Sequence, residues 1–167
     1  MYAQALRTLL ATLVEQWESE AVEFKRAGDG FSTHDIGKYF SALSNEANLR
    51  GLERAWLVFG VHDKTRMVVG TDYRVERDRL RKLKMQIAEG AEPSVTLREI
   101  HELNAPQGRV LLFEIPAAPL GIPVAWQGHY YARAGERLTS LGLDKQDAIR
   151  RQVGRRTGRR KLWLALR

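Results

Sequence analysis

The sequence predicts an α+β domain in which helices pack on a mixed, mainly antiparallel sheet. Apolar residues recur every three to four positions in some segments, and in others they alternate or run without interruption. Helix and strand patterns follow each other without a regular βα repeat, so strand pairing is expected to be mixed. The chain has 167 residues, which is a usual size for one domain with its own core.

Composition excludes several classes of protein. Hydrophobic residues make up 44% and charged residues 28%, which excludes a disordered or collagen-like chain. No apolar run reaches the roughly 18 residues needed to cross a bilayer, so we expect no membrane partner. The chain has no cysteine, which removes disulfides and thiolate metal sites and suits a reducing compartment. The first residues lack a signal-peptide pattern, so we expect a cytoplasmic protein.

The N-terminal third predicts a helix, a strand and a second helix. Residues 1–17 place apolar side chains at steps of three and four, which indicates an amphipathic helix. Apolar and polar residues alternate over 21–25, which indicates a strand in which Glu23 faces away from its apolar neighbours. Ser32, with Asp35 three positions later, resembles a capping box and predicts a helix start.

The middle of the chain predicts a central strand and a basic helix. Residues 45–54 show no clean period and are expected to form a loop. The continuous apolar run 55–61 indicates a strand covered on both faces, and 67–70 is expected to pair back with it as a hairpin. Residues 76–89 predict a basic helix whose leucines and isoleucine face inward, ended by a glycine and a proline.

The C-terminal third predicts strands, a short helix and a tail. Asp144 is expected to cap the last helix, with Ala148 and Ile149 facing the core. A basic tail, residues 151–167, follows the domain at 18–150. Three stretches predict further strands, the last of them bent or broken at a Gln-Gly pair: 95–103, 110–115 and 124–134.

Positive charge is concentrated in two places. The chain has 27 basic and 20 acidic residues, a formal charge of +7. Residues 150–167 hold eight basic residues and no acidic one, and residues 64–84 hold eight basic against three acidic. Such runs form either a solvated surface or a phosphate-binding surface. The excess of arginine in the tail favours phosphate contact, because its planar fork suits bidentate binding.

Three carboxylates form a second candidate site. If the strands at Glu23 and before Asp63 pair, both carboxylates and Glu18 could converge. Such a trio would bind Mg²⁺ or Mn²⁺ and activate water for phosphodiester cleavage. The alternative is structural: Glu18 is a surface charge, Glu23 pairs with Lys25 or an arginine, and Asp63 caps a turn. Phosphate-loop, dinucleotide and serine-hydrolase motifs are absent from the sequence.

Six short motifs occur in an order that is more specific than any one of them. They are Glu23-Phe24-Lys25, Ala42-Leu43-Ser44-Asn45, Leu57-Val58-Phe59-Gly60-Val61 leading to Asp63, Val69-Gly70, the stretch 110–116, and the stretch 130–139. Together they resemble the Schlafen AlbA_2 domain family over about residues 16–150. The fold class expected from the residues is that of the family.

The resemblance implies a nucleic-acid-binding domain, commonly fused in bacteria to regulatory modules, and so part of a transcriptional regulator or a defence protein. In vertebrate Schlafen proteins two such lobes form a positive groove that binds tRNA beside a three-carboxylate nuclease site. Glu18, Glu23 and Asp63 fall where those carboxylates would be. A single lobe would need a homodimer to form a groove, and the N-terminal helix is a candidate for that contact.

We therefore expect a domain that contacts the phosphate backbone of DNA or RNA, with Tyr130 and Tyr131 able to stack on unpaired bases. The alternative is a divalent-metal-dependent endoribonuclease, cleaving tRNA or rRNA, with Glu18, Glu23 and Asp63 as catalytic and metal-binding residues. The residues expected to meet phosphates are Lys25, Arg74, Arg77, Arg79, Arg81, Lys82, Lys84, Arg133, Arg137, Arg155, Arg156, Arg159 and Arg160.

Overall fold

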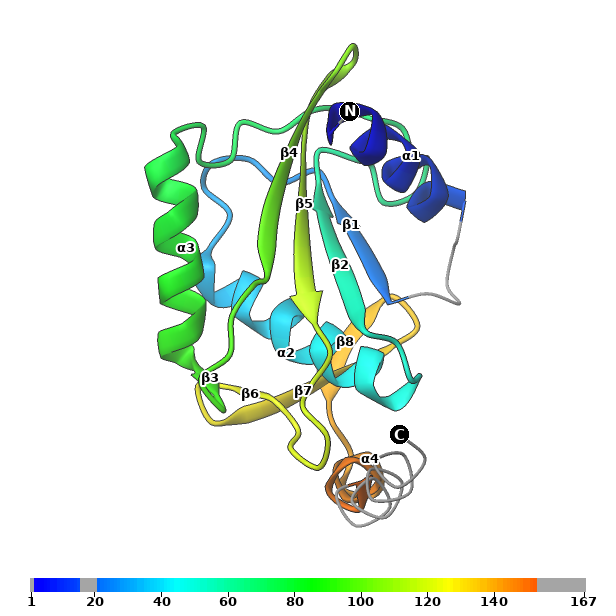
Figure 1. The fold of residues 1–167 in the computed structure, drawn as a ribbon, viewed down its shortest axis with the longest axis vertical. Helices are drawn as coiled ribbons and strands as arrows, with labels where there is room; N and C mark the ends of the chain where they lie inside the picture. The colour runs from blue at the N-terminus through cyan, green and yellow to red at the C-terminus, as the bar shows by residue number, and fades with distance from the viewer. Residues whose placement is uncertain (1, 16–20, 153–167) are drawn as a thin grey trace, which may run out of the picture.

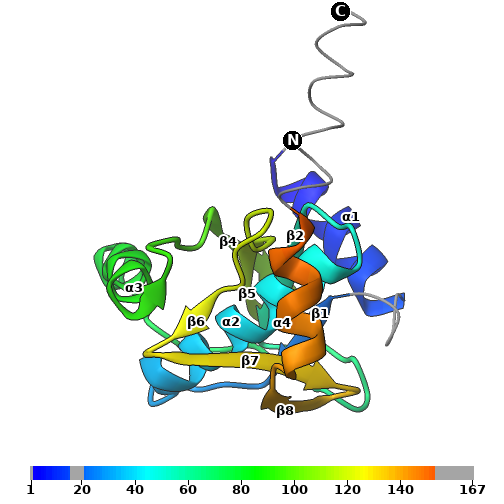
Figure 2. The same cartoon turned by 90° about the horizontal axis from the view of Figure 1, so that it is seen from below.

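A computed structural model describes residues 2–15 and 21–152 of the chain. These residues form an α+β fold in layers: helix α1, a four-stranded sheet, helix α2 and a second sheet (Figures 1 and 2). The helices are α1 (Tyr2–Glu15), α2 (Thr33–Leu49), α3 (Arg77–Gly90) and α4 (Leu143–Arg150). None of the helices in the described part of the chain is long and apolar enough to span a membrane.

The strands form two sheets where one was expected, and their pairing is mainly antiparallel, as predicted. The first has the order β1 (Val22–Lys25), β2 (Arg54–Phe59), β5 (Gly108–Pro116), β4 (Glu99–Ala105). The second has the order β3 (Ala91–Glu92), β6 (Ala125–Trp126), β7 (His129–Ala134), β8 (Arg137–Ser140). Strand β1 runs parallel to β2, and the remaining pairs are antiparallel.

Strand β2 is the central strand that its apolar run predicted. Trp56 and Val58 pack with α1 on one face, while Leu57 and Phe59 pack with α2 and α3 on the other. The expected return strand at 67–70 is reduced to one bridge between Val61 and Val68. The expected strand at 95–103 begins only at Glu99, and 124–134 breaks at Gln127-Gly128 into β6 and β7 as expected.

The leucine stripe of helix α1 packs against the sheet of its own chain. Leu6, Leu10 and Leu13 are buried in the cluster that covers β1, β2, β5 and β4. Burying three leucines against the sheet stabilises the fold by several kcal/mol, at roughly 2 kcal/mol each. The face that was the candidate for a dimer contact is therefore covered by the chain's own sheet, and the homodimer remains a prediction.

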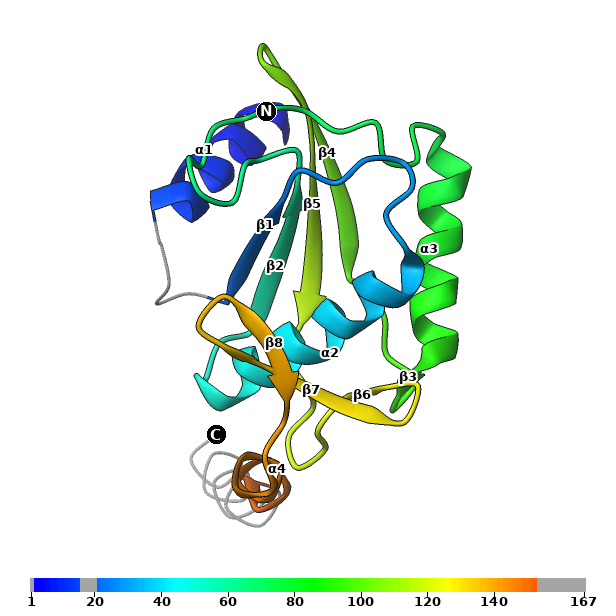
Figure 3. The same cartoon turned by 180° about the vertical axis from the view of Figure 1, so that it is seen from behind.

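Helix α2 is longer than expected, because the segment 45–54 was predicted as a loop and its first half is helical. The Asn45 side chain lies inside, where Nδ2 donates to the carbonyls of Val124 (2.9 Å) and Tyr131 (3.0 Å). Its Oδ1 accepts from the Val124 N–H at 2.8 Å. In Figure 3, α2 lies between the two sheets. The side chains of Ser41 and Asn45 bond the backbone of Tyr131 and so hold the second sheet on this helix.

The helix caps are confirmed in one case and wrong in the other. Ser32 caps α2, and its hydroxyl accepts from the Asp35 N–H at 3.0 Å. The N-cap of α4 is Gly142, without a side-chain hydrogen bond, and Asp144 lies within the first turn. Ile149 faces inward and Ala148 is exposed, because only one side of this short helix meets the body.

Candidate nucleic-acid interface

Helix α3 carries basic residues on the sides that do not face the core. Leu80, Leu83 and Ile87 lie in the core at helical spacing. Arg77, Arg81, Lys82 and Lys84 form what we call the α3 basic face. Arg77, Arg81 and Lys84 are spaced i, i+4 and i+7, so they line one side of the helix.

Most of the α3 basic face is open to solvent. Arg77 and Lys82 are exposed, and no ion pair within residues 2–15 and 21–152 involves either of them. The Arg81 side chain is 73% exposed, with a loose pair to Asp78 at 3.6 Å. Lys84 is half-buried and donates to the Arg98 carbonyl at 3.2 Å. Exposed pairs of this kind contribute little to stability, so these cations are free to meet anions.

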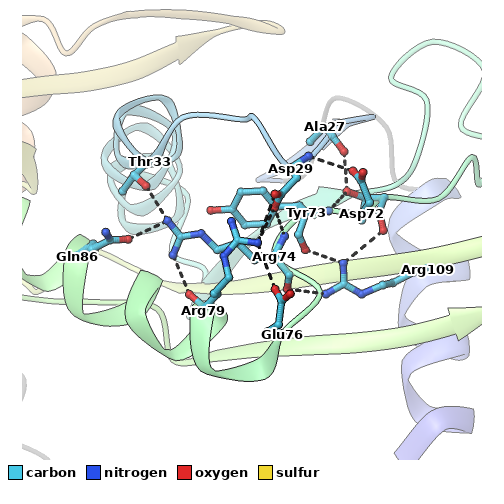
Figure 4. Close-up of polar contacts among 11 residues, drawn as sticks. Ala27, Asp29, Thr33, Asp72, Tyr73, Arg74, Glu76, Arg79, Gln86 and Arg109 are labelled. Atoms are coloured by element: carbon cyan, nitrogen blue, oxygen red, sulfur yellow. Dashed lines mark hydrogen bonds and ion pairs between the residues drawn. The ribbon is translucent and has the colours of Figure 1, made fainter.

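Two other predicted arginines are held by contacts within the chain (Figure 4). The Arg74 guanidinium donates to the Arg79 carbonyl (2.7 Å), to Thr33 Oγ1 (3.1 Å) and to Gln86 Oε1 (3.0 Å). The Arg79 guanidinium lies 3.1 Å from Asp29 and 3.2 Å from Glu76. These contacts join the loop before α2 to the start of α3, so both arginines have structural partners.

Asp29 is the acid that joins these loops. It accepts from the Arg74 backbone N–H at 2.7 Å and from the Arg79 guanidinium. The N–H of Arg74, followed by the Arg79 side chain, lowers the pKa of the Asp29 carboxyl. Hydrogen bonds from its own backbone N–H and from Arg79 likewise lower the pKa of Glu76.

Arg109, which we had not predicted to have a role, completes this network. Its side chain is 13% exposed and pairs with Glu102 at 2.5 Å. It also donates to the carbonyls of Tyr73 (2.6 Å) and Arg74 (3.1 Å). One guanidinium thus holds β4 and the loop before α3 on β5. Only the fold brings these carbonyls to Arg109, so the sequence contained no signal for it.

Arg133 and Glu23 form a buried pair. Arg133 donates to the Val22 carbonyl at 2.8 Å, and its guanidinium lies 3.8 Å from Glu23. Their side chains are 10% and 8% exposed, which leaves Arg133 little surface for a phosphate. Burial raises the pKa of the Glu23 carboxyl, and the charge of Arg133 opposes that shift. Glu23 Oε1 has no hydrogen bond.

The remaining predicted basic residues are scattered. Arg137 is exposed on β8, and Lys25 is half-buried with its ammonium 5.1 Å from the centre of the Tyr39 ring. Tyr130 and Tyr131 are both half-buried against apolar clusters, which leaves only part of each ring open. The tail residues Arg155, Arg156, Arg159 and Arg160 lie outside the described residues.

The carboxylate trio is not assembled by the residues that the structure describes. Glu23 faces away from Val22 and Phe24, as predicted, and its register partner is Leu57. Asp63 lies beyond the end of β2, half-exposed beside His62 at 3.5 Å. Within the described ranges no three His, Cys, Asp or Glu side chains are grouped to hold a metal. Glu18 lies outside these ranges, so the trio remains a prediction.

The fold resembles that of a solved structure at low sequence identity. No curated protein sequence matches the chain. One solved structure, the DIP2311 protein from Corynebacterium diphtheriae, matches with a TM-score of 0.55 at 17% identity, covering 82% of this chain and 27% of that one. Another, the N-terminal domain of a RecG-related protein from Nitrosomonas europaea, matches with a TM-score of 0.47 at 23% identity, covering 81% of this chain and 92% of that one.

The family assignment rests on sequence. The family described as Schlafen, AlbA_2 matches residues 18–141, which is most of the domain expected at 18–150. The match includes β1, β2, α3 and the β7–β8 pair, so it covers both the α3 basic face and the Glu23–Arg133 pair. The chain therefore belongs to the Schlafen AlbA_2 domain family.

Proposed function

We propose that this domain binds nucleic acid by contacting its phosphates with the α3 basic face. The observation that carries the proposal is the open row of Arg77, Arg81 and Lys84 along one side of α3. Lys82 is exposed about 100° around the helix from Arg81. Arg77 and Lys82 have no ion pair within the described residues. A row of cations spaced along a helix matches the repeated negative charge of a phosphate backbone. The resemblance to a nucleic-acid-binding family supports the same conclusion.

The chemistry of these side chains defines the expected binding mode. Guanidinium groups bind phosphate oxygens in pairs, and backbone contacts carry no base information of their own. Binding should therefore weaken steeply with salt and accept both RNA and DNA strands. The tail arginines, such as Arg155 and Arg159, would extend the positive surface, and deleting residues 153–167 would measure their share.

Charge reversal tests the proposal. The triple variant Arg77→Glu, Arg81→Glu, Lys82→Glu should lower the affinity for a labelled single-stranded RNA by roughly 100-fold at about 50 mM salt. Fluorescence anisotropy would measure it, and circular dichroism would confirm that the variant is folded. Arg7, Lys64 and Lys145 are exposed on other surfaces and provide a matched control with the same total change of charge.

The control decides the outcome. Reversal of Arg7, Lys64 and Lys145 should reduce affinity only slightly, because it alters the net charge and leaves the α3 basic face intact. Equal losses in the two triple variants would mean that only net charge matters. That result would remove the α3 basic face as the binding surface.

The second candidate is a metal-dependent endoribonuclease, favoured by the buried Glu23 carboxylate with its unbonded Oε1. If Glu18 and Asp63 join it, Glu23→Gln should abolish Mn²⁺-dependent fragments of tRNA on a denaturing gel and preserve binding. Glu53→Gln, an exposed carboxylate, is the control. Absence of EDTA-sensitive fragments from the unaltered protein would reject this candidate.

A further inference from the structure

A hollow of about 420 Å³ borders the α3 basic face. Its lining comes from the start of α1, from α3 with the residues before it, and from the edge strand β4. In Figure 1, α1 and α3 stand on either side of β4. Its volume lies in the range of small-ligand sites and is large enough for one nucleobase.

The two walls of the hollow carry opposite charges. Arg77, Arg81 and Lys84 line it from α3, and Glu99 and Glu102 line it from β4. Glu102 is engaged by Arg109, whereas Glu99 is exposed and belongs to no ion pair within residues 2–15 and 21–152. Glu99 Oε1 accepts from the Ile100 N–H at 3.1 Å, so Oε2 is the oxygen that would accept from a ligand. Phosphate oxygens would bind on the α3 side. The Glu99 wall would repel phosphate and accept hydrogen bonds from an N–H donor.

An anchored aromatic ring stands at the rim. Tyr2 lines the hollow and is 59% exposed. Its hydroxyl is hydrogen-bonded to His101 Nδ1, and His101 Nε2 is bonded to Glu114 at 3.0 Å. The hydroxyl is therefore held while more than half of the residue stays exposed, as a stacking platform requires.

Apolar side chains also line the hollow. Leu80 and Ile100 line the hollow together with Val75, which is 59% exposed. A flat aromatic ligand could cover these side chains, stack on Tyr2 and leave its polar edge for Glu99. The arrangement combines a phosphate-binding wall, an aromatic platform, an apolar lining and one hydrogen-bond acceptor.

We propose that this hollow holds an unpaired nucleobase with an exocyclic amino group, from a strand whose phosphates lie on the α3 basic face. The proposal rests on the proposed function and narrows its ligand to single-stranded nucleic acid. Cytosine and adenine carry an exocyclic amino group whose N–H groups can donate to Glu99. The one N–H of unpaired thymine lies between two carbonyl oxygens, which repel a carboxylate. A duplex pairs these same edges, so its bases cannot enter.

The first experiment measures base preference. The full chain is titrated with labelled 12-residue oligo(dC) and oligo(dT), and oligo(dC) should bind about fivefold more tightly. A duplex of mixed sequence should bind more weakly than oligo(dC). In Glu99→Gln the preference should disappear, because an amide can also donate to thymine. Glu53→Gln, at another exposed carboxylate, should keep the preference.

The second experiment tests the platform. Tyr2→Ala should weaken oligo(dC) binding about fivefold or more, whereas Tyr2→Phe should keep most of the affinity because the stacking face remains. Equal affinity for oligo(dC) and oligo(dT), with no change in Glu99→Gln and Tyr2→Ala, would overturn this proposal. If the α3 charge reversal still weakened binding, the proposed function would stand. Absence of binding to every oligonucleotide at low salt would overturn both.

Discussion

The basic residues of this domain divide into two groups that look alike in the sequence. Arg74, Arg79, Arg109 and Arg133, which we call the internal arginines, donate to carbonyls or pair with acids of distant segments. The residues of the α3 basic face have at most a loose ion pair or one carbonyl partner within the described residues. The first group is engaged by partners within the fold, and the second is available for a ligand.

The difference comes from contacts at long range in the sequence. Arg79 and Arg81 are two positions apart on the same helix, yet only Arg79 lies beside Asp29, fifty positions away. A helix turns about 200° over two residues, so the two side chains leave it on opposite sides. The net charge of a segment therefore overstates its binding surface, because part of that charge is already neutralised by the fold.

The largest expected effect is on stability, in Arg109→Ala. The substitution leaves Glu102 and the carbonyls of Tyr73 and Arg74 without their donor. Breaking such a partly buried network should lower the free energy of unfolding by about 3 kcal/mol. Urea unfolding followed by circular dichroism would measure it.

Arg81→Ala is the matched substitution in the α3 basic face. Its side chain is 73% exposed, so the free energy of unfolding should change by no more than about 0.5 kcal/mol. If Arg109→Ala were as harmless as Arg81→Ala, the division into two groups would have no energetic basis.

A smaller effect is expected from the pH dependence of the Glu23–Arg133 pair. Burial raises the pKa of Glu23 above its ordinary 4.5, so the folded state holds the proton more tightly than the unfolded state. The stability contributed by this group is complete below pH 4.5 and is lost as the pH rises through the folded-state pKa. Unfolding curves from pH 4 to 7 should show that the free energy of unfolding of wild type falls relative to that of Glu23→Gln as the pH rises. A rise in the relative stability of wild type with pH would contradict the raised pKa of Glu23.

The smallest effect, with the opposite sign, is expected at Asp29. The Arg74 N–H and the Arg79 side chain lower its pKa below the ordinary 3.8. The contribution is therefore present above pH 3.8 and is lost as the pH falls through the folded-state pKa. Wild type should exceed Asp29→Asn in stability near neutral pH, and the gap should close in acid. A gap that is independent of pH would mean that the carboxylate charge does not matter.

The sequence predicted the elements whose signal is local. The periods in α1 and α3, the apolar run of β2 and the Ser32 cap all depend on neighbours within a few positions. The order of short motifs also indicated the family. The orientation of Glu23, away from Val22 and Phe24, followed from simple alternation.

What could not be predicted depends on partners far along the chain. The segment that begins at Asn45 has no clean apolar period, so it was expected to be a loop. In the structure the Asn45 amide bonds the backbone of Val124 and Tyr131, and α2 continues to Leu49. Arg74 and Arg133 were expected to bind phosphate, because the sequence does not reveal their internal acceptors. These acceptors, on Thr33 and Val22, lie 41 and 111 positions away. The hollow beside α3 likewise exists only once α1 and β4 come together.

The salt dependence of binding in Arg81→Ala and Arg79→Ala tests the central claim most directly. Each variant removes one positive charge from the same helix, and the affinity for one single-stranded RNA is measured over a range of salt concentrations. The account predicts that the slope of log K against log salt falls by about 0.7 in Arg81→Ala, because one phosphate contact is lost, and stays unchanged in Arg79→Ala. An equal fall in both variants, or in neither, would contradict the assignment of the α3 basic face as the phosphate-binding surface.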